Sequence, residues 1–315
     1  MGSSGAPVGA LVAALLVVAL SMAGCSGGSS GGSSSGAELP APPSYPDRLS
    51  RTDRDLAAAF DGINRAPNQP ALARAVLAAA GTVSSASQWL ASGGPTPGPM
   101  ATTNDALTGT LSQFANELAY LGQQISQRVI CTGATAVGAI STAPSAAALR
   151  AEVDRLAHPA GGGPGYRWGE FLPPPKDQTN TRVPNGQLVV DRRGSAGGAA
   201  GNGVLEVQND GDDDAVVALA RNGSTVLEVA VRAGQSSEVN GIPDGSYDVY
   251  YLTGSDWDQV AHGFGRQCEF HRFTGPSAFN STPVPGGISY TEQTITVRTT
   301  TSPDTAVVEP DGLPR

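Results

Sequence analysis

The chain has 315 residues, of which 19 are Lys or Arg and 28 are Asp or Glu, so its formal net charge is -9. This acidic balance excludes the clustered basic side chains that nucleic-acid phosphates require, and we expect no nucleic-acid partner. The length exceeds that of one typical core and predicts two domains, while 41 Gly and 24 Pro residues predict long connecting segments.

An apolar run lies near the N-terminus, at residues 11–24, and ends at Cys25 before a Gly/Ser-rich stretch. An apolar run of this length that ends in small residues is typical of a secretory signal rather than of a membrane-spanning helix. The sequence Met22-Ala23-Gly24-Cys25 resembles the lipobox of bacterial lipoproteins, with Met22 where leucine is usual. The resemblance implies that residues 1–24 are a cleaved signal peptide and that Cys25 carries the lipid.

Acylation of Cys25 would place the protein on the extracytoplasmic face of the cell membrane, with the membrane itself as a partner. Acyl chains such as palmitate contribute roughly 0.8 kcal/mol per buried methylene, and two or three chains give a stable anchor. Residues 25–47 then form the lipidated cysteine and a flexible tether, because their Gly/Ser/Pro-rich composition cannot bury enough apolar surface to fold. Two alternatives are a plain secretory signal with an incidental cysteine and an uncleaved anchor.

Residues 48–160 have the periodicity of amphipathic helices and predict an N-terminal antiparallel helical bundle. Thr52 and Asp55 suggest a capping box for a first helix, and Pro70 suits the first turn of a second. A fourth helix is expected from Pro144 to His158. The third carries the strongest apolar seam in the chain, formed by Leu107, Leu111, Phe114, Leu118, Leu121, Ile125 and Val129.

Residues 161–202 form a Gly/Pro-rich connector in which Tyr166, Trp168 and Phe171 are expected to pack the helices against the rest. Residues 203–300 change to a period of two, with about seven β-type runs separated by turn signals, which predicts a C-terminal antiparallel β-sandwich. The fold class is therefore α+β with two domains. Residues 301–315 are expected to be a disordered tail.

The stretch from Ala215 to Tyr251 resembles prealbumin-like domains of bacterial surface proteins. The shared pattern is a valine-rich strand, Asn222-Gly223, a strand that ends in Arg232-Ala233-Gly234, and then Ile242-Pro243-Asp244-Gly245-Ser246-Tyr247. The whole arrangement also looks like uncharacterised actinobacterial lipoproteins. Neither resemblance implies an activity, because a shared fold alone does not give function.

Three cysteines are present, and Cys131 and Cys268 remain if Cys25 is lipidated. In an oxidising compartment these two would form a disulfide that ties the helical region to the β region. The alternative is a pair of free or buried thiols, since sequence alone does not show whether the sulfurs meet.

No catalytic set emerges from the motifs. The three histidines, His158, His262 and His271, lack the spacing of a zinc site, and no Gly-x-Ser-x-Gly elbow, P-loop or dinucleotide fingerprint is present. Asp210, Asp212, Asp213 and Asp214 do not match an EF-hand and are expected to form a solvated turn. We therefore expect no catalytic residue, no metal and no cofactor.

One ligand site has some physical basis. Tyr251 and Trp257 lie in the β region beside Asp256 and Arg266, with Tyr250, Phe264, Phe270 and Asp258 nearby. Aromatic faces with charged rims suit carbohydrate stacking, provided that the rings are exposed. We favour the other interpretation, in which these rings form the sandwich core and Trp257 caps one end of it.

These features together favour a lipid-anchored cell-envelope protein that is not an enzyme and has a binding or scaffolding role toward an envelope protein or glycan. The first alternative is a surface carbohydrate-binding module. A secreted hydrolase with an unrecognised site is the second, and it requires a serine and a carboxylate such as Asp256 or Asp258 beside His262.

Overall fold

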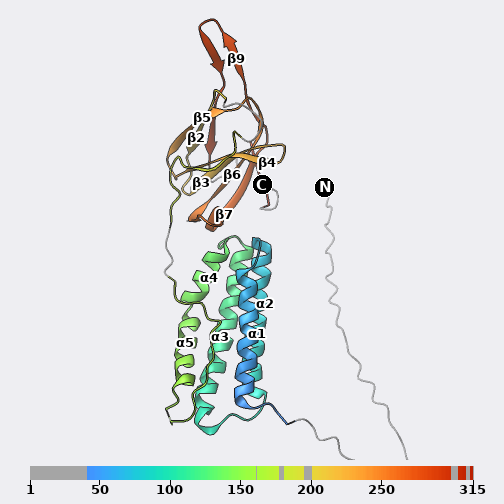
Figure 1. The fold of residues 1–315 in the computed structure, drawn as a ribbon, viewed down its shortest axis with the longest axis vertical. Helices are drawn as coiled ribbons and strands as arrows, with labels where there is room; N and C mark the ends of the chain where they lie inside the picture. The colour runs from blue at the N-terminus through green and yellow to red at the C-terminus, as the bar shows by residue number, and fades with distance from the viewer. Residues whose placement is uncertain are drawn as a thin grey trace, which may run out of the picture. The chain divides into compact units, whose positions relative to one another are not determined.

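The computed structural model describes residues 41–160, 162–176, 181–194, 201–298, 304–309 and 313–314. Helices occupy the N-terminal part and strands the C-terminal part, so the chain is α+β, as the sequence predicts (Figure 1). The apolar run, Cys25 and most of the expected tether lie outside the described residues.

Five α-helices are found among the described residues. Their bounds are α1 (Tyr45–Asn64), α2 (Gln69–Ser92), α3 (Ala101–Ser126), α4 (Gly133–Thr142) and α5 (Pro144–Ala157), with a 3-10 turn at Gly98–Met100 before α3. Helix α2 packs along both α1 and α3, and α3 also packs against α5. Within this part of the chain, no helix is both long enough and apolar enough to cross a membrane.

The helix starts follow local capping, but one differs from expectation. Helix α1 begins at Tyr45, where the Ser44 hydroxyl accepts the amide of Asp47. The predicted cap at Thr52 is wrong: Thr52 is buried inside α1, and its hydroxyl donates to the Leu49 carbonyl. Helix α2 is capped by the Asn68 side chain and carries its proline in the first turn, as predicted.

The apolar seam of α3 is confirmed through Ile125, since each seam residue up to that point is buried. Val129 falls after the end of α3 and is 39 % exposed, so the seam ends one step earlier than predicted. Helix α4 was not predicted. Its sequence, Gly-Ala-Thr-Ala-Val-Gly-Ala-Ile-Ser-Thr, is dominated by small residues and gives little helical periodicity.

Aromatic residues of the expected connector pack into the helical core itself. The Trp168 indole donates to the Thr52 hydroxyl of α1 at 3.1 Å, and its ring meets Phe171 at 5.2 Å. Phe171 in turn lies 5.3 Å from the ring of Phe60. This segment therefore completes the helical core rather than joining it to the strands.

The strands form three sheets among the described residues. Their bounds are β1 (Leu188–Asp191), β2 (Gly203–Asn209), β3 (Asp214–Arg221), β4 (Ser224–Val231), β5 (Ser236–Ile242), β6 (Gly245–Asp258), β7 (Gly263–Phe273), β8 (Ser277–Phe279), β9 (Ser281–Val284), β10 (Gly287–Tyr290), β11 (Glu292–Val297) and β12 (Thr305–Val307). The 7-stranded sheet has the order β1-β4-β3-β6-β7-β12, with β8 paired to β6. The 3-stranded sheet is β11-β2-β5, and β9 and β10 form a sheet of their own.

Two details of the β region depart from the expected pattern. The pairing of β11 with β2 is parallel, whereas the other described strand pairs are antiparallel. Strand β12 lies within the segment expected to be a disordered tail and pairs with β7. A three-residue edge strand is too short to give a periodic signal in the sequence.

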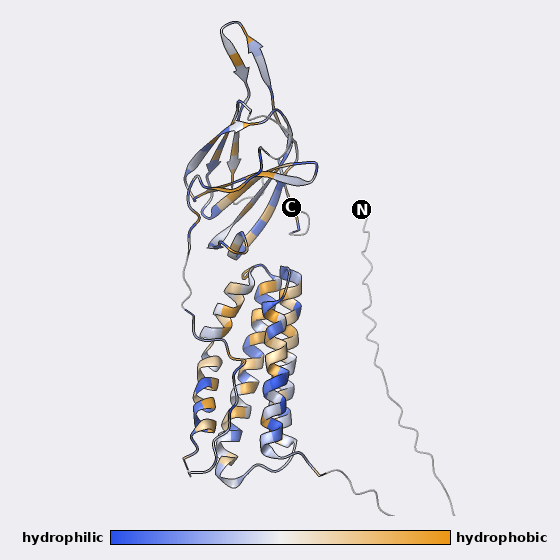
Figure 2. Cartoon of the chain, viewed as in Figure 1, coloured by the Kyte–Doolittle hydropathy of each residue, from blue (hydrophilic) through white to orange (hydrophobic). Residues whose placement is uncertain are grey.

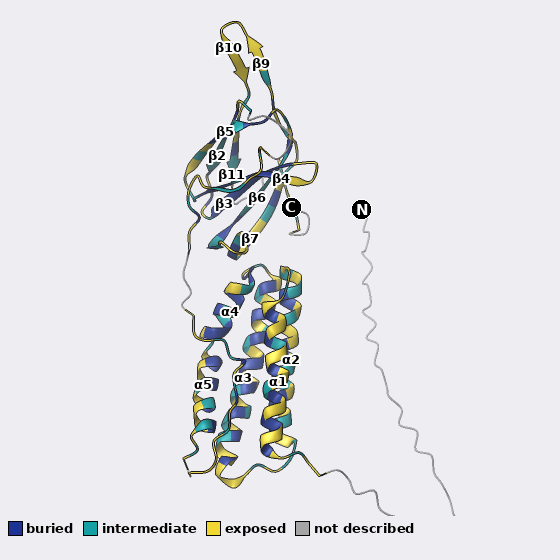
Figure 3. Ribbon diagram, in the orientation of Figure 1, coloured by how far each residue is buried: buried dark blue, intermediate teal, exposed yellow. Residues whose placement is uncertain are grey.

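The apolar residues of the two larger sheets share one core. Val207 of β2, Val217 of β3 and Tyr251 of β6 belong to this cluster, together with Ile295 of β11. Figures 2 and 3 show the same pattern, with apolar and buried positions along these strands. A separate cluster fills the helical region, so each region buries its own apolar surface.

Arg48 is fully buried in the helical region, and its charge is directed at carbonyl groups. Its guanidinium donates to the carbonyls of Leu90 at 3.0 Å and Pro95 at 2.7 Å. Leu90 lies in the last turn of α2, where unpaired carbonyls and the helix dipole favour a cation. Burial is the main cause that raises the pKa of the neighbouring Tyr45 to about 12, although Arg48 acts in the opposite direction.

Arg48→Gln is expected to lower the free energy of unfolding by about 3 kcal/mol, because it removes a buried charge that satisfies two carbonyls. Arg51→Gln is the matched control: it lies on the same helix, is exposed, and should cost less than about 1 kcal/mol. Urea unfolding followed by far-UV circular dichroism measures both. Equal effects of the two substitutions would contradict the role assigned to Arg48.

Candidate functional site

The segment from Arg128 to Cys131, just after α3, lies beside strand β7. Main-chain hydrogen bonds join the two: the Cys131 amide donates to the Gly265 carbonyl at 2.9 Å, and the Cys268 amide donates to the Arg128 carbonyl at 3.2 Å. Ile130 and Arg266 form an antiparallel bridge. The end of the helical region thus extends the sheet locally, and this contact defines the junction between helices and strands.

The disulfide between Cys131 and Cys268 is present at this junction, as the sequence predicts. The two Cα atoms are 6.3 Å apart, within the range that disulfides adopt. The bond closes a sequence separation of 137 residues and covalently ties the helical region to β7.

A cavity of about 290 Å³ opens next to this junction, and we call it the junction cavity. Its polar lining carries charges of both signs, from Lys176 and Arg266 and from Asp256 and Asp258. The complete lining is Ala134, Thr135, Gly138, Lys176, Thr181, Asp256, Trp257, Asp258, Gln259 and Arg266. Helix α4, the connector and strands β6 and β7 all contribute to it.

Asp256 organises the wall of the junction cavity. Its carboxylate lies 3.7 Å from Nε of Arg266 and accepts the amide of Thr181 at 3.3 Å. The Trp257 amide donates to the Thr181 carbonyl at 2.7 Å, so the connector is fixed to the end of β6. Asp256 adopts a φ of 60°, a left-handed conformation that side chains rarely take.

Gly265 permits the close approach of α4 to β7 in this wall. A Cβ atom at this position would lie 2.3 Å from the Thr135 hydroxyl and 2.9 Å from the Asp256 carbonyl oxygen. Any larger residue would push the helix away from the strand. The arrangement offers carboxylates, cations and a hydroxyl to a polar ligand.

Burial confirms the interpretation of Tyr251 and Trp257 as core residues and contradicts the stacking role considered for them. Tyr251 is 1 % exposed and stacks on the ring of His271 at 4.7 Å, and Trp257 is 6 % exposed and packs against Phe264. Tyr251 belongs to the core shared by the two larger sheets, whereas Trp257 lies beyond a register shift of β6 and belongs to a separate small cluster with Val183 and Phe264. Asp256 and Arg266, the other two predicted residues, do meet in the junction cavity.

The histidines do not form a catalytic group with serine. His158 is exposed at the end of α5, 3.2 Å from the Asp154 carboxylate. His262 is exposed, and its ring makes no hydrogen bond to a serine among the described residues. His271 is buried, with Nε2 at 3.1 Å from Glu269. The condition that the hydrolase hypothesis sets is therefore not met at His262.

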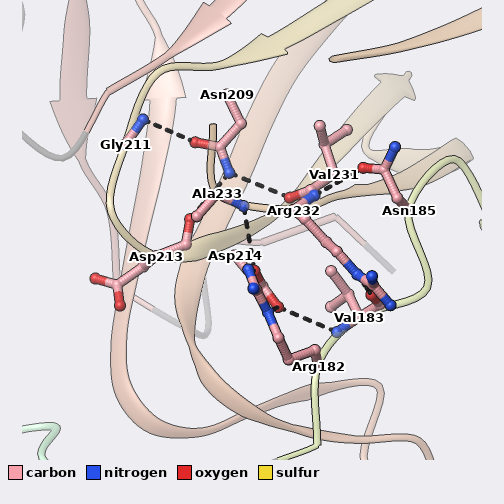
Figure 4. A network of polar contacts seen from close by, with 10 residues as sticks. All are labelled: Arg182, Val183, Asn185, Asn209, Gly211, Asp213, Asp214, Val231, Arg232 and Ala233. Atoms are coloured by element: carbon pink, nitrogen blue, oxygen red, sulfur yellow. Dashed lines mark hydrogen bonds and ion pairs between the residues drawn. The ribbon is translucent and has the colours of Figure 1, made fainter. Parts of the chain in front are cut away.

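Hydrogen bonds organise the acidic turn before β3. Figure 4 shows that Asp214 accepts hydrogen bonds from the Arg182 side chain and from the amides of Val183 and Ala233. Burial acts to raise the pKa of Asp214, but these hydrogen bonds outweigh it and hold the pKa below its usual value. Asn209 closes the turn by accepting the Gly211 amide.

No group of three His, Cys, Asp or Glu side chains with metal-binding geometry occurs in the described part of the chain.

A second cavity, of about 560 Å³, also borders the disulfide and involves residues that sequence reasoning missed. Burial, followed by the charge of Glu269, raises the pKa of Asp213 in its wall. The lining is Gln127, Arg128, Val129, Asp213, Gln267, Cys268, Glu269, His271 and Val307. These residues do not form a motif in the sequence, and neither do Lys176 and Thr135 of the junction cavity. Each set comes together only in the folded chain, where β7 meets the helical region.

Comparisons with models of protein families, with curated proteins and with solved structures found no match for this chain.

Removal of the disulfide by Cys131→Ala with Cys268→Ala is expected to lower the free energy of unfolding by about 3–5 kcal/mol, because the bond closes a long loop in the unfolded chain. Urea unfolding with and without a reductant measures this. The wild-type protein under reductant is the control and should approach the double variant. A wild-type midpoint that does not move on full reduction would contradict this prediction.

Asp214→Asn is expected to lower the free energy of unfolding at pH 7 by about 2 kcal/mol, because a buried charged acceptor is lost. The loss is not larger because Arg182, its ion-pair partner, is half exposed and can be solvated by water. The pKa of Asp214 is lowered by folding, so its contribution is present above the unfolded pKa and is lost as the pH falls. The difference between wild type and variant should therefore shrink below about pH 4.

Unfolding curves between pH 7 and pH 2 test this pH dependence. Asp248→Asn, in an exposed pair with Arg272, is the matched control and should have a small effect at every pH. A difference for Asp214→Asn that stays constant down to pH 2 would show that its ionisation does not contribute.

Proposed function

We propose that this protein is a lipid-anchored component of the cell envelope, held on the extracytoplasmic face of the membrane through Cys25, with a non-catalytic binding or scaffolding role. The observation that carries the proposal is the Cys131–Cys268 disulfide, because such bonds persist in oxidising compartments outside the cytoplasm. It supports the same location as the lipobox-like sequence, and the two features are independent in the chain.

In this proposal the folded part has two domains, an antiparallel helical bundle at residues 48–160 and a β-sandwich at residues 203–300. The separate apolar clusters of the two regions support this division. The sharing of one cluster by the 7-stranded and 3-stranded sheets supports a sandwich. The connector at residues 161–202 contributes to both, through Trp168 on the helical side and Val183 on the strand side.

The binding role is assigned to the junction cavity, with Asp256 and Arg266 as its polar groups. The lining supports a small polar ligand or a polar segment of an envelope protein rather than the stacked sugar of a carbohydrate-binding module. The burial of Trp257 argues against the stacked sugar. Charges of both signs within one small cavity favour a partner that carries both a donor and an acceptor.

Cys25→Ser tests the anchor. The wild-type chain is expected in the membrane fraction with added lipid mass and a mature N-terminus at residue 25, because acyl chains on that thiol supply the membrane affinity. The variant should leave the membrane fraction. Intact mass and fractionation of both proteins are the measurements, and Cys131→Ala with Cys268→Ala is the control that should remain anchored. A Cys25→Ser protein that stays in the membrane fraction would contradict the proposal.

A further inference from the structure

Strands β9 and β10 form a hairpin that stands apart from the two larger sheets. Figures 1 and 3 show it projecting from the β region, with exposed residues along both strands. Val284, Ile288 and Tyr290 are 43 %, 52 % and 45 % exposed. An isolated two-stranded hairpin is marginally stable in water, so a hairpin that exposes apolar side chains gains by pairing with another strand.

One face of this hairpin is apolar and free of charge. The register places Pro283 opposite Ile288 and Ser281 opposite Tyr290, so these four side chains share a face. No Asp, Glu, Lys or Arg occurs between Arg272 and Glu292. The net charge of the chain is -9, so two copies repel each other over much of their surface. At this uncharged stretch they can meet without direct repulsion between like charges.

The outer edge of β9 is blocked. The Thr291 amide donates to the Asn280 carbonyl, and the alternation of an antiparallel ladder then makes Ser281 and Pro283 point their main-chain groups outward. Proline has no amide hydrogen, and the Ser281 amide already donates to the Asp244 carboxylate at 3.0 Å. A strand arriving at β9 would therefore find no free donor at either position.

The outer edge of β10 is open. By the same alternation, Ile288 and Tyr290 point their amides and carbonyls away from β9. Within the described chain neither residue gives these groups to another partner. Native proteins usually protect such an edge with a proline, a charge or a bulge, and β10 has none of these at its two outward positions.

We propose that β10 is a self-association edge that pairs antiparallel with β10 of a second copy. Pairing about a two-fold axis at Ser289 places Ile288 of each copy opposite Tyr290 of the other, where both pairs of outward groups exchange hydrogen bonds. Each exchange also aligns a β-branched with an aromatic side chain, a favourable cross-strand pair. The two hairpins then form one four-stranded sheet with a continuous apolar face.

A membrane is a less suitable occupant of this edge. Lipid offers no partner for the outward amides and carbonyls of Ile288 and Tyr290, and such groups are costly to bury without one. The contact between two hairpins is much smaller than a standard stable interface, so the association should be weak in dilute solution. The inference does not depend on the anchor, although attachment of both copies to one surface would favour it.

Cross-linking through a new cysteine tests the register. Ser289 of the two copies would face each other across a non-hydrogen-bonded pair, with Cα atoms close enough for a disulfide. The full-length chain with Ser289→Cys is expected to form a reducible covalent dimer under mild oxidation. Thr282→Cys is the matched control, because Thr282 pairs with Ser289 within the hairpin but lies on the blocked strand. Both variants keep the same native cysteines, so any covalent dimer that forms through those cysteines is equal in the two.

Sedimentation analysis without cross-linking supplies the second readout. The wild-type mass should rise toward twice the monomer mass as concentration increases, and Ile288→Pro should abolish this rise. That substitution removes an outward donor but no hydrogen bond inside the hairpin. Equal cross-linking of Ser289→Cys and Thr282→Cys, or none, would overturn the proposal. A second result would also overturn it: a wild-type protein that stays monomeric but binds phosphatidylglycerol vesicles, with that binding lost in Ile288→Pro. The exposed face of the hairpin would then bind a membrane.

Discussion

The bond between Cys131 and Cys268 is the constraint on which the arrangement of the junction depends. It joins a segment that directly follows α3 to the middle of β7, across a sequence separation of 137 residues. The main-chain hydrogen bonds beside it are few and lie at the ends of two separately packed regions. Without the covalent bond, two regions that each bury their own core would be held by those few hydrogen bonds, by the contact of α4 with β7 and by the bonds of the connector to β6.

The junction matters because both cavities border it. Arg266 bridges to Ile130 and lines the junction cavity, whereas Gln267 and Cys268, the next residues of β7, line the second cavity. The register of β7 against β6 shifts at this point and Gln267 adopts a φ of 51°, so one short stretch of β7 can serve two cavities. Because the disulfide lies on that stretch, a change in the contact between helices and strands would change the shape of both cavities.

Much of the fold could be predicted from the sequence because it depends on periodicity. The seam of α3 and the alternation of β2 follow directly from where apolar residues recur, and the cysteine pair follows from number and compartment. Helix α4, built of small residues, and strand β12, only three residues long, carry no such period. Both were missed for that reason.

The candidate site could be predicted only in part. Asp256 and Arg266 were selected because they neighbour aromatic residues, yet they meet because β6 and β7 are paired and the connector bonds to both Asp256 and Trp257. Burial of the rings agrees with the favoured interpretation, but the sequence alone could not decide it, because an aromatic residue on a strand looks the same in sequence whether it faces ligand or core. Lys176 and Thr135 reach the same cavity from other elements, so the charge pattern of the site is a property of the tertiary contact. A ligand for this protein should accordingly be sought by its fit to paired opposite charges rather than by its fit to an aromatic platform.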